Sequence, residues 1–147
     1  MESFVPTRTP EPPAGTRILN LEATSSLQVI ERLDEGLATD SVVRLASHLE
    51  LPVGRVLELV DIKSSTFHDR KKRRRRLSPE ESGRVYRLAK VVEAAEAYFE
   101  EGGAARRWLS HPKVALGGKA PLAVSRTAEG ADYVIKLLGR MAHGVIS

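Results

Sequence analysis

The stretch from Leu51 to Arg76 constrains the fold of this 147-residue chain more than any other. Its first part, LPVGRVLELVDI, predicts a helix that ends in a tight turn, and the segment that begins at Ser64, SSTFHDRKK, predicts the start of a second helix. Seven consecutive cations, from Arg70 to Arg76, complete the stretch. Two short helices joined by a tight turn, with the second polar at its start and basic at its end, are typical of a helix-turn-helix whose second helix enters the DNA major groove.

The positive charge of the chain is concentrated around this second helix. Between Lys63 and Lys90 there are 11 Lys and Arg residues and 3 acidic residues, a net charge of +8, whereas the whole chain carries +4. A patch of this kind neutralises phosphates and releases counterions, so it gives affinity for nucleic acid that falls with salt. A solvated charged face or a partly disordered connector is the alternative for a block of like charges. The helix-turn-helix pattern that precedes the patch favours nucleic acid.

Within the predicted recognition helix, Ser64 is the expected N-cap, and Phe67 is the apolar residue expected to anchor the helix to its neighbours. The other side chains can reach base edges or phosphates. Asp69 is expected to pair with a neighbouring arginine or to accept from a cytosine amino group. The residues expected to contact DNA are Ser64, Ser65, Thr66, His68, Arg70, Lys71, Lys72, Arg73 and Arg74.

Composition excludes several classes of protein. No segment reaches the roughly 20 apolar residues of a membrane-spanning helix, and the N-terminus lacks the apolar run of a signal peptide, so we expect no membrane partner. Four scattered His and no Cys give no metal-ligand spacing, so we expect no metal and no other cofactor. Without a recognisable nucleophile–base pair, carboxylate pair or nucleotide loop, we expect no catalytic residue and no enzyme. The absence of Cys permits a reducing cytoplasm.

The ends of the predicted elements divide the chain into four parts. Residues 1–15 contain four prolines and few apolar residues, which predicts a disordered tail. Residues 16–78 hold a short extended piece at 17–21, helices near 24–36 and 40–49, and the helix-turn-helix. Residues 79–103 form a connecting or dimerising helix, and residues 104–147 form a C-terminal domain. In the helix near 24–36, a spacing of three aligns Leu27, Ile30 and Leu33.

The connecting helix has a well-specified start. Ser78-Pro79-Glu80-Glu81 combines an N-cap serine, proline at the first helical position and glutamate at the third, which predicts a capping box. A narrow apolar seam follows, and its alternatives are the core of one copy or contact with a second copy. The glycines at 102 and 103 are expected to end the helix. The seam consists of Val85, Leu88, Val92, Ala95 and Phe99.

The last part of the chain predicts a loop and a final helix. A glycine-containing loop is expected over 116–122, and Thr127 is expected to cap a helix that Gly144 closes. Trp108, on a short preceding helix, is expected in the core more readily than at an interface. The apolar stripe expected on the final helix consists of Ala131, Val134, Ile135, Leu138 and Ala142.

Five motifs in a fixed order resemble the Xre/MbcA/ParS-like antitoxins, the partners of RES-domain toxins, over about residues 37–146. The resemblance implies an all-α chain in which an Xre-like helix-turn-helix region precedes a small helical toxin-binding domain. It also implies a bacterial type II toxin–antitoxin system, with a toxin that resembles ADP-ribosyltransferases and consumes NAD. The motifs are Leu77-Ser78-Pro79-Glu80-Glu81-Ser82, Trp108-Leu109-x-x-Pro112, Leu116-Gly117-Gly118-x-x-Pro121-Leu122, Thr127-x-x-Gly130 and Leu138-Gly139-Arg140-x-x-His143-Gly144-Val145.

This resemblance implies that the antitoxin binds the toxin directly and, within a hetero-oligomer, represses the shared promoter. We expect the last helix and tail to block a nucleotide-binding cleft of the toxin. For Arg140, solvation or an intrahelical pair is the alternative, and for His143 it is an interaction with the helix dipole. The residues expected to contact the toxin are Val134, Leu138, Arg140, Met141, His143, Gly144, Val145, Ile146 and Ser147. The competing hypothesis is a stand-alone repressor whose C-terminal domain only dimerises.

Overall fold

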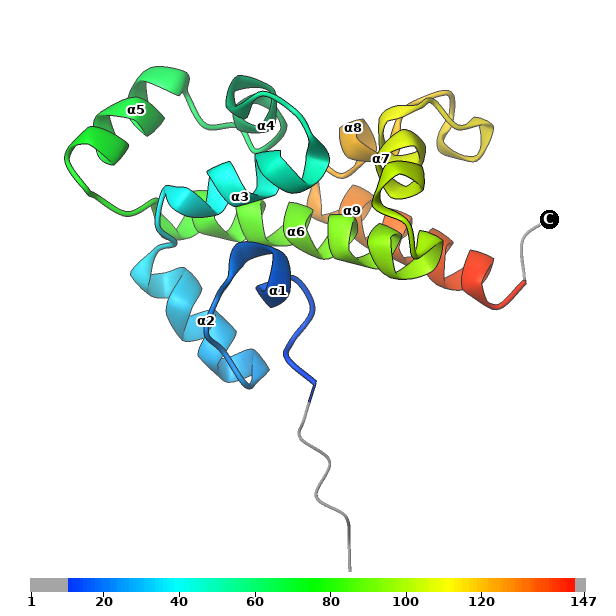
Figure 1. Cartoon of the computed structure of the whole chain (residues 1–147), viewed down its shortest axis with the longest axis horizontal. Helices are drawn as coiled ribbons and strands as arrows, with labels where there is room; N and C mark the ends of the chain where they lie inside the picture. Colours follow the sequence, from blue (N-terminus) through cyan, green and yellow to red (C-terminus); the bar gives the residue numbers. More distant parts are fainter. Residues whose placement is uncertain (1–10, 145–147) are drawn as a thin grey trace, which may run out of the picture.

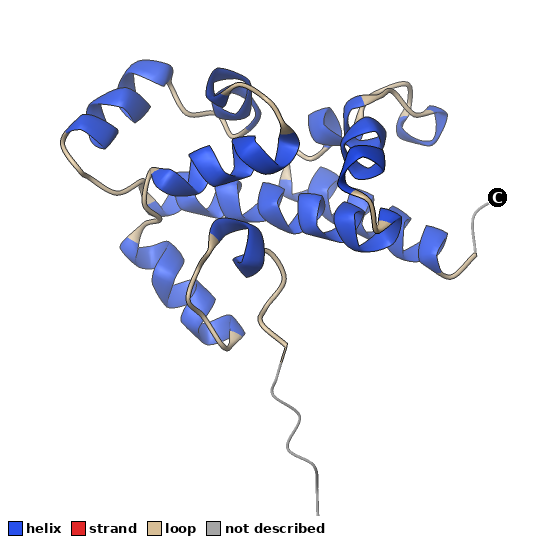
Figure 2. Cartoon of the chain, viewed as in Figure 1, coloured by secondary structure: helices blue, strands red, loops and turns tan. Residues whose placement is uncertain are grey.

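A computed structural model describes residues 11–144, and in this part of the chain helices joined by loops are present and no strand is (Figure 2). The all-α fold expected from the sequence is therefore confirmed. The helices are α1 (Thr16–Leu19), α2 (Ser26–Glu35), α3 (Asp40–Leu49), α4 (Val53–Leu59), α5 (Ser64–Lys72), α6 (Pro79–Phe99), α7 (Gly102–Ser110), the 3-10 helix η1 (Val114–Leu116), α8 (Pro121–Val124) and α9 (Ala128–Ala142). None of these helices is long and apolar enough to cross a membrane.

Helix α6 is the axis of the fold, and α1, α2, α3, α7 and α9 pack against it (Figure 1). Its start is fixed by the predicted capping box: the Glu81 N–H donates to Ser78 Oγ at 3.1 Å, and the Ser78 N–H donates to Glu81 Oε1 at 2.7 Å. The side chain of Ser82, one residue further on, accepts from the Leu37 N–H at 2.8 Å. The first turn of α6 is thereby attached to the segment between α2 and α3.

The apolar seam of α6 lies in the core of a single copy. Val85, Leu88, Val92 and Ala95 are each at most 3% exposed. Phe99 is half-buried, and its ring centroid lies 5.9 Å from that of Trp108, which is also half-buried. The core interpretation of the seam is therefore confirmed, and a second copy cannot reach these four buried side chains in this conformation.

The segment that precedes α2 differs from the prediction. Residues 16–19 form a helix, where an extended piece was predicted, because Ile18 and Leu19 bury 98% and 96% of their surface in the core. The chain just before it is also bound to α6: the Gly15 N–H donates to Glu93 at 2.8 Å, and Tyr86 donates to the Ala14 carbonyl at 2.6 Å. The predicted tail is therefore wrong for these residues, and residues 1–10 of that tail lie outside the described part of the chain.

Helix α2 begins and ends where the sequence predicts but turns a different face to the core. Its N-cap is Ser25 and its C-cap Gly36, whose φ of +92° lies in the left-handed region. A Cβ on Gly36 would overlap the Leu77 carbonyl oxygen, so glycine is required there. Val29 is 4% exposed, whereas Leu27 and Ile30 of the predicted stripe are 66% and 54% exposed.

The junction between α6 and α7 corrects a second prediction. Helix α6 ends at Phe99, and Glu100 takes the left-handed C-cap position with φ +56°. Gly102 and Gly103 do not end this helix; they form the first turn of α7. The loop predicted over 116–122 overlaps the end of η1 and the start of α8, and a bridge between Lys113 and Lys119 closes the segment around η1.

Candidate functional site

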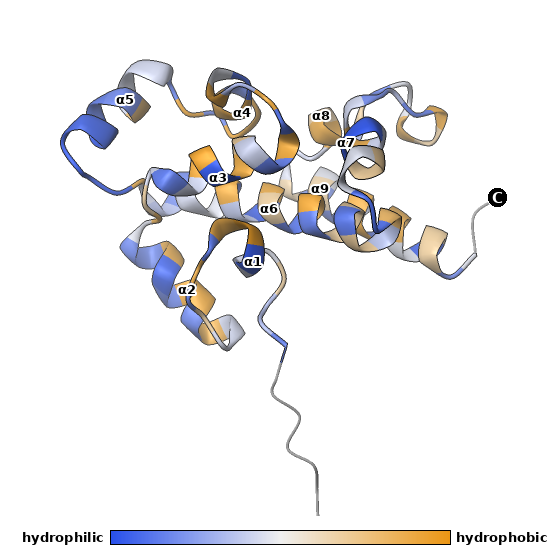
Figure 3. Ribbon diagram, in the orientation of Figure 1, coloured by the Kyte–Doolittle hydropathy of each residue, from blue (hydrophilic) through white to orange (hydrophobic). Residues whose placement is uncertain are grey.

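The helix-turn-helix consists of α4, the turn over residues 60–63, and α5. Phe67, at 1% exposed, is the one buried residue of α5 and anchors it as the sequence predicts. Almost all of the rest of α5 and the segment that follows it is hydrophilic (Figure 3). The helix protrudes at one end of the molecule (Figure 1). A polar helix attached through one aromatic side chain leaves most of its surface available to a partner.

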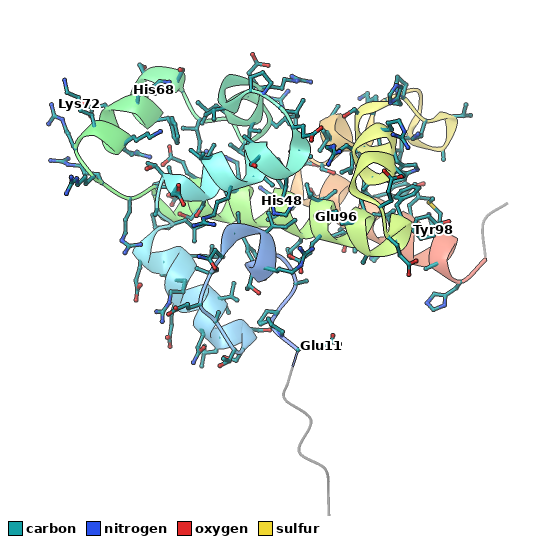
Figure 4. All side chains as sticks on the ribbon, viewed as in Figure 1. Glu11, His48, His68, Lys72, Glu96 and Tyr98 are labelled. Carbon is teal, nitrogen blue, oxygen red and sulfur yellow. The ribbon has the colours of Figure 1, made fainter. Side chains whose placement is uncertain are left out.

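The start of α5 is shifted by one residue from the prediction. Lys63 occupies the N-cap position, without a capping hydrogen bond from its side chain, and Ser64 is the first helical residue. Ser64 and Ser65 are exposed and Thr66 is half-buried. His68 is exposed, with its ring edge-on to that of Phe67 at 5.3 Å (Figure 4). These short polar side chains at the helix start have the position from which recognition helices contact base edges.

The consecutive cations span the end of α5 and the loop after it. Helix α5 ends at Lys72, and Arg74 has φ +56°, which turns the chain out of the helical direction. Arg73 Nε lies 3.0 Å from Asp69 Oδ1, so the expected pairing of Asp69 with a neighbouring arginine is confirmed. The side chains exposed in this run are those of Lys71, Lys72, Arg73, Arg74, Arg75 and Arg76.

Besides Arg73, three arginines between Lys63 and Lys90 bind other elements of the protein. Arg70 forms an ion pair with Glu81, and these side chains are only 25% and 12% exposed. Arg76 donates to the Gly36 carbonyl at 3.0 Å. Arg84 of α6 donates to the carbonyls of Val60 and Asp61 at 2.6 and 3.1 Å. The predicted role of Arg70 in DNA contact is therefore in conflict with its ion pair, and we remove it from the candidate set.

The Arg70–Glu81 pair also changes the acidity of Glu81. Burial raises the pKa of the Glu81 carboxyl, but hydrogen bonds from Ser78 and Arg70 lower it more in total, so its pKa lies below the ordinary 4.5. The carboxylate therefore stays charged and holds two elements at once: it caps α6 and binds the last full turn of α5.

At the other end of the chain, α9 is capped by Thr127, whose Oγ1 accepts from the Gly130 N–H at 3.0 Å, as predicted. A Cβ on Gly130 would overlap the Val124 carbonyl oxygen, so this glycine permits the close approach of α8 and α9. Val134 and Leu138 are 0% and 3% exposed. Their predicted contact with a toxin is wrong for this conformation, because both face the core on the side of α9 that packs on α6.

The exposed end of α9 carries the remaining candidate residues. The Arg140 guanidinium lies 5.7 Å from the centre of the Tyr133 ring, and Tyr133 is 47% exposed. Met141 is half-buried, and His143 is the exposed C-cap of the helix. Gly144, with φ +68°, closes α9 as predicted. The other candidates, Val145, Ile146 and Ser147, fall outside residues 11–144.

The two candidate surfaces lie at opposite ends of the longest axis of the molecule (Figure 1). Helix α5 and the cations after it, residues 73–76, lie at one end, and the last turns of α9 lie at the other. Between them, α3 and α6 are joined by the core and by His48, whose Nδ1 lies 3.2 Å from Glu96 Oε1 (Figure 4). A ligand bound at one end therefore leaves the other accessible.

Fold and site together define an all-helical protein of the helix-turn-helix class. Residues 28–90 match the model of the antitoxin Xre-like helix-turn-helix domain, and residues 94–144 match that of the antitoxin Xre/MbcA/ParS C-terminal toxin-binding domain. The chain belongs to the Xre/MbcA/ParS family of antitoxins. It is therefore an antitoxin with a helix-turn-helix domain and a C-terminal toxin-binding domain.

Individual relatives support this assignment along the whole chain. The antitoxin Xre of Yersinia enterocolitica is 30% identical over 148 aligned residues, which cover 100% of both chains. The antitoxin Xre of Pseudomonas putida is 34% identical over 126 residues, which cover 84% of this chain and 76% of that one. A Prs ADP-ribosylating antitoxin of a Sphingobium species is 27% identical over 136 residues, which cover 86% of each.

Sequence reasoning missed two residues of these surfaces. Arg84 was assigned to the basic patch, but it hydrogen-bonds residues 23 and 24 positions earlier, and no local pattern signals such a bond. Tyr133 was not selected, although it lies seven positions before Arg140 on the same helix. Residues seven apart fall on one face after two helical turns, so that spacing was the available signal.

Proposed function

We propose that this antitoxin neutralises a cognate RES-domain toxin that consumes NAD, and that it binds the promoter DNA of its own operon. The proposed binding of a toxin is supported by the match of residues 94–144 to the toxin-binding domain of the family. The relative from Sphingobium is named a Prs ADP-ribosylating antitoxin, which supports a toxin with ADP-ribosyltransferase-like chemistry.

The end of α9 and the residues after it are the proposed contact with the toxin. Tyr133, Arg140 and Met141 are of the residue types enriched at protein interfaces, and an arginine that lies over an aromatic ring is already partly ordered. Arg140 is exposed, so its guanidinium is available to acidic groups of a toxin. Gly144 ends the helix, and we propose that residues 145–147, which follow it in the sequence, enter the cleft of the toxin.

The DNA half of the proposal is supported by the exposed polar start of α5 and the cations after it. Ser64, Ser65, Thr66 and His68 are the proposed base-edge contacts. The proposed phosphate contacts are Lys71, Lys72, Arg73, Arg74 and Arg75. We further propose self-association within the hetero-oligomer, through a surface other than the buried seam of α6, and a cytoplasmic location in a bacterium.

Co-expression tests the toxin half of the proposal. The reading frame beside this gene is expected to encode a RES-domain toxin, and the full chain is expected to restore growth to cells that express it. A chain that lacks residues 144–147 should neutralise the toxin less well, as should one with Tyr133 and Arg140 both replaced by alanine. Arg44→Ala, at an exposed arginine of α3, is the control. If the shortened chain neutralises the toxin as well as the full chain does, residues 144–147 do not block the toxin.

The stand-alone repressor is the alternative that the same experiment addresses. Pull-down must use the full chain, because α7 and α9 pack on α6 and a fragment that starts at residue 104 loses that support. If no toxin of RES type binds the full chain, while the chain still binds its promoter, the repressor hypothesis replaces the antitoxin mechanism proposed above.

A further inference from the structure

Helix α5 has few apolar contacts to fix its direction. Only Phe67 is buried among its nine residues, and an anchor of one side chain permits the helix to rotate and tilt. Readout of base edges requires side chains held within roughly 0.5 Å and 10–20° of the productive geometry. Other contacts must therefore hold α5 in place if it is to recognise a sequence.

Arg84 supplies one of these contacts through the turn that precedes α5. Its Nε donates to the Val60 carbonyl at 2.6 Å and its Nη2 to the Asp61 carbonyl at 3.1 Å. Asp61 has φ +53°, in the left-handed region where a non-glycine residue is strained, and Val60 is 1% exposed. The planar fork of the guanidinium thus binds two successive carbonyls of the turn and joins it to α6.

Arg70 supplies the second contact at the other end of α5. It forms an ion pair with Glu81, which is itself held by the Ser78 N–H in the capping box of α6. Both contacts therefore lead to the first turns of α6, Glu81 and Arg84 being three residues apart on one face of that helix. The turn before the recognition helix and the last full turn of that helix are therefore both attached to α6.

We propose that Arg84 and Arg70 are positioning residues for DNA recognition: they hold α5 in the orientation that reads base edges and do not contact phosphate. This inference rests on the DNA binding proposed above. The cations between Lys63 and Lys90 then fall into two groups: those that fix the orientation of α5 and those that bind DNA. Arg75 represents the second group, because its exposed side chain makes no hydrogen bond or ion pair with residues 11–144.

The proposal is tested by binding of the full chain to two duplexes over a range of salt: the promoter region of its own gene, and a mixed-sequence duplex of equal length. The variants are Arg84→Gln and Arg84→Lys, with Arg75→Gln and Arg75→Lys as matched controls. A phosphate contact contributes about 0.9 to the slope of log affinity against log salt, and lysine can replace arginine as its cation.

We expect Arg84→Gln and Arg84→Lys to behave alike, because neither side chain has the planar guanidinium fork whose Nε and Nη2 donate to the two carbonyls. Each should bind the promoter about tenfold more weakly, with an unchanged salt slope and with affinity for the mixed sequence within about twofold of wild type. Arg75→Gln should lower the slope by about 0.9 for both duplexes, and Arg75→Lys should resemble wild type. Arg70→Lys should keep more promoter preference than Arg70→Gln, because lysine still pairs with Glu81.

Several results would overturn the inference. A slope lowered by Arg84→Gln and restored by Arg84→Lys would make Arg84 a phosphate contact. Loss of folding in Arg84→Lys, seen by circular dichroism, would show that the side chain holds the whole fold and not one helix. A wild-type chain whose DNA affinity did not respond to salt would overturn the proposed DNA binding itself, and the inference with it.

Discussion

The clearest quantitative prediction concerns four cations of the basic run. Lys71, Lys72, Arg74 and Arg75 are exposed, and none makes an ion pair with the described residues. If each contacts one phosphate, replacing all four by alanine removes about 3.6 from the salt slope. Between about 50 and 200 mM salt, the affinity of wild type should then fall about 150-fold more than that of the variant.

The assay is titration of a fluorescent duplex at several salt concentrations, with the slope as the measured quantity. The control is a variant in which four exposed cations outside the helix-turn-helix, Arg44, Arg107, Lys119 and Lys136, become alanine. It changes the net charge by the same amount and should keep the slope, because phosphate contacts act locally. A slope reduction below about 1, or one equal to that of the control, would refute the proposed phosphate contacts.

The remaining predictions concern stability, measured by urea denaturation. Ser78→Ala removes the side-chain cap of α6 and should cost about 1 kcal/mol of unfolding free energy; no loss would contradict the capping role. Because the folded pKa of Glu81 is depressed, its stabilisation is present above about pH 4.5 and is lost as the pH falls through the folded pKa. Glu81→Gln should therefore weaken the dependence of stability on pH in this acidic range. An unchanged dependence would show that ionised Glu81 does not stabilise the fold. Leu138→Ala opens a cavity in the core and should cost about 3 kcal/mol, whereas a loss below about 1 kcal/mol would contradict its burial.

Elements specified by local chemistry were predictable from the sequence. Helix α6 starts at Pro79 because Ser78 and Glu81 satisfy each other's backbone N–H groups within four residues. Thr127 caps the start of α9 from one side only, because its side chain accepts from the Gly130 N–H, and Gly144 permits the left-handed residue that ends the helix. The helix-turn-helix and its anchor Phe67 also followed from the spacing of apolar and polar residues.

Features that depend on distant parts of the chain were not predictable. Residues 16–19 are helical because Ile18 and Leu19 pack into a core built mainly by later helices. Leu27 and Leu33 belong to the same predicted stripe of α2, but Leu27 is 66% exposed and Leu33 packs partly buried against the core. The position of α6 decides which face of α2 is buried. The ion pair of Arg70 with Glu81 spans 11 residues, and a run of identical charges gives no sign of which one is bound.

The surfaces at the two ends explain how one small antitoxin can serve two partners. The core is continuous from α3 through α6 to α9, so the ends are held at a fixed separation. A toxin bound at the last turns of α9 would leave α5 accessible to DNA. A complex of promoter, antitoxin and toxin is therefore compatible with the fold.

Hydrogen–deuterium exchange of the full chain, with and without its cognate toxin, tests this separation most directly. We predict that the toxin slows amide exchange in α9 and over residues 143–147, and leaves exchange in α5 and over residues 73–76 unchanged. Slower amide exchange in α5 and over residues 73–76, with no change at the end of α9, would contradict the proposal that the toxin binds at α9 and DNA at α5.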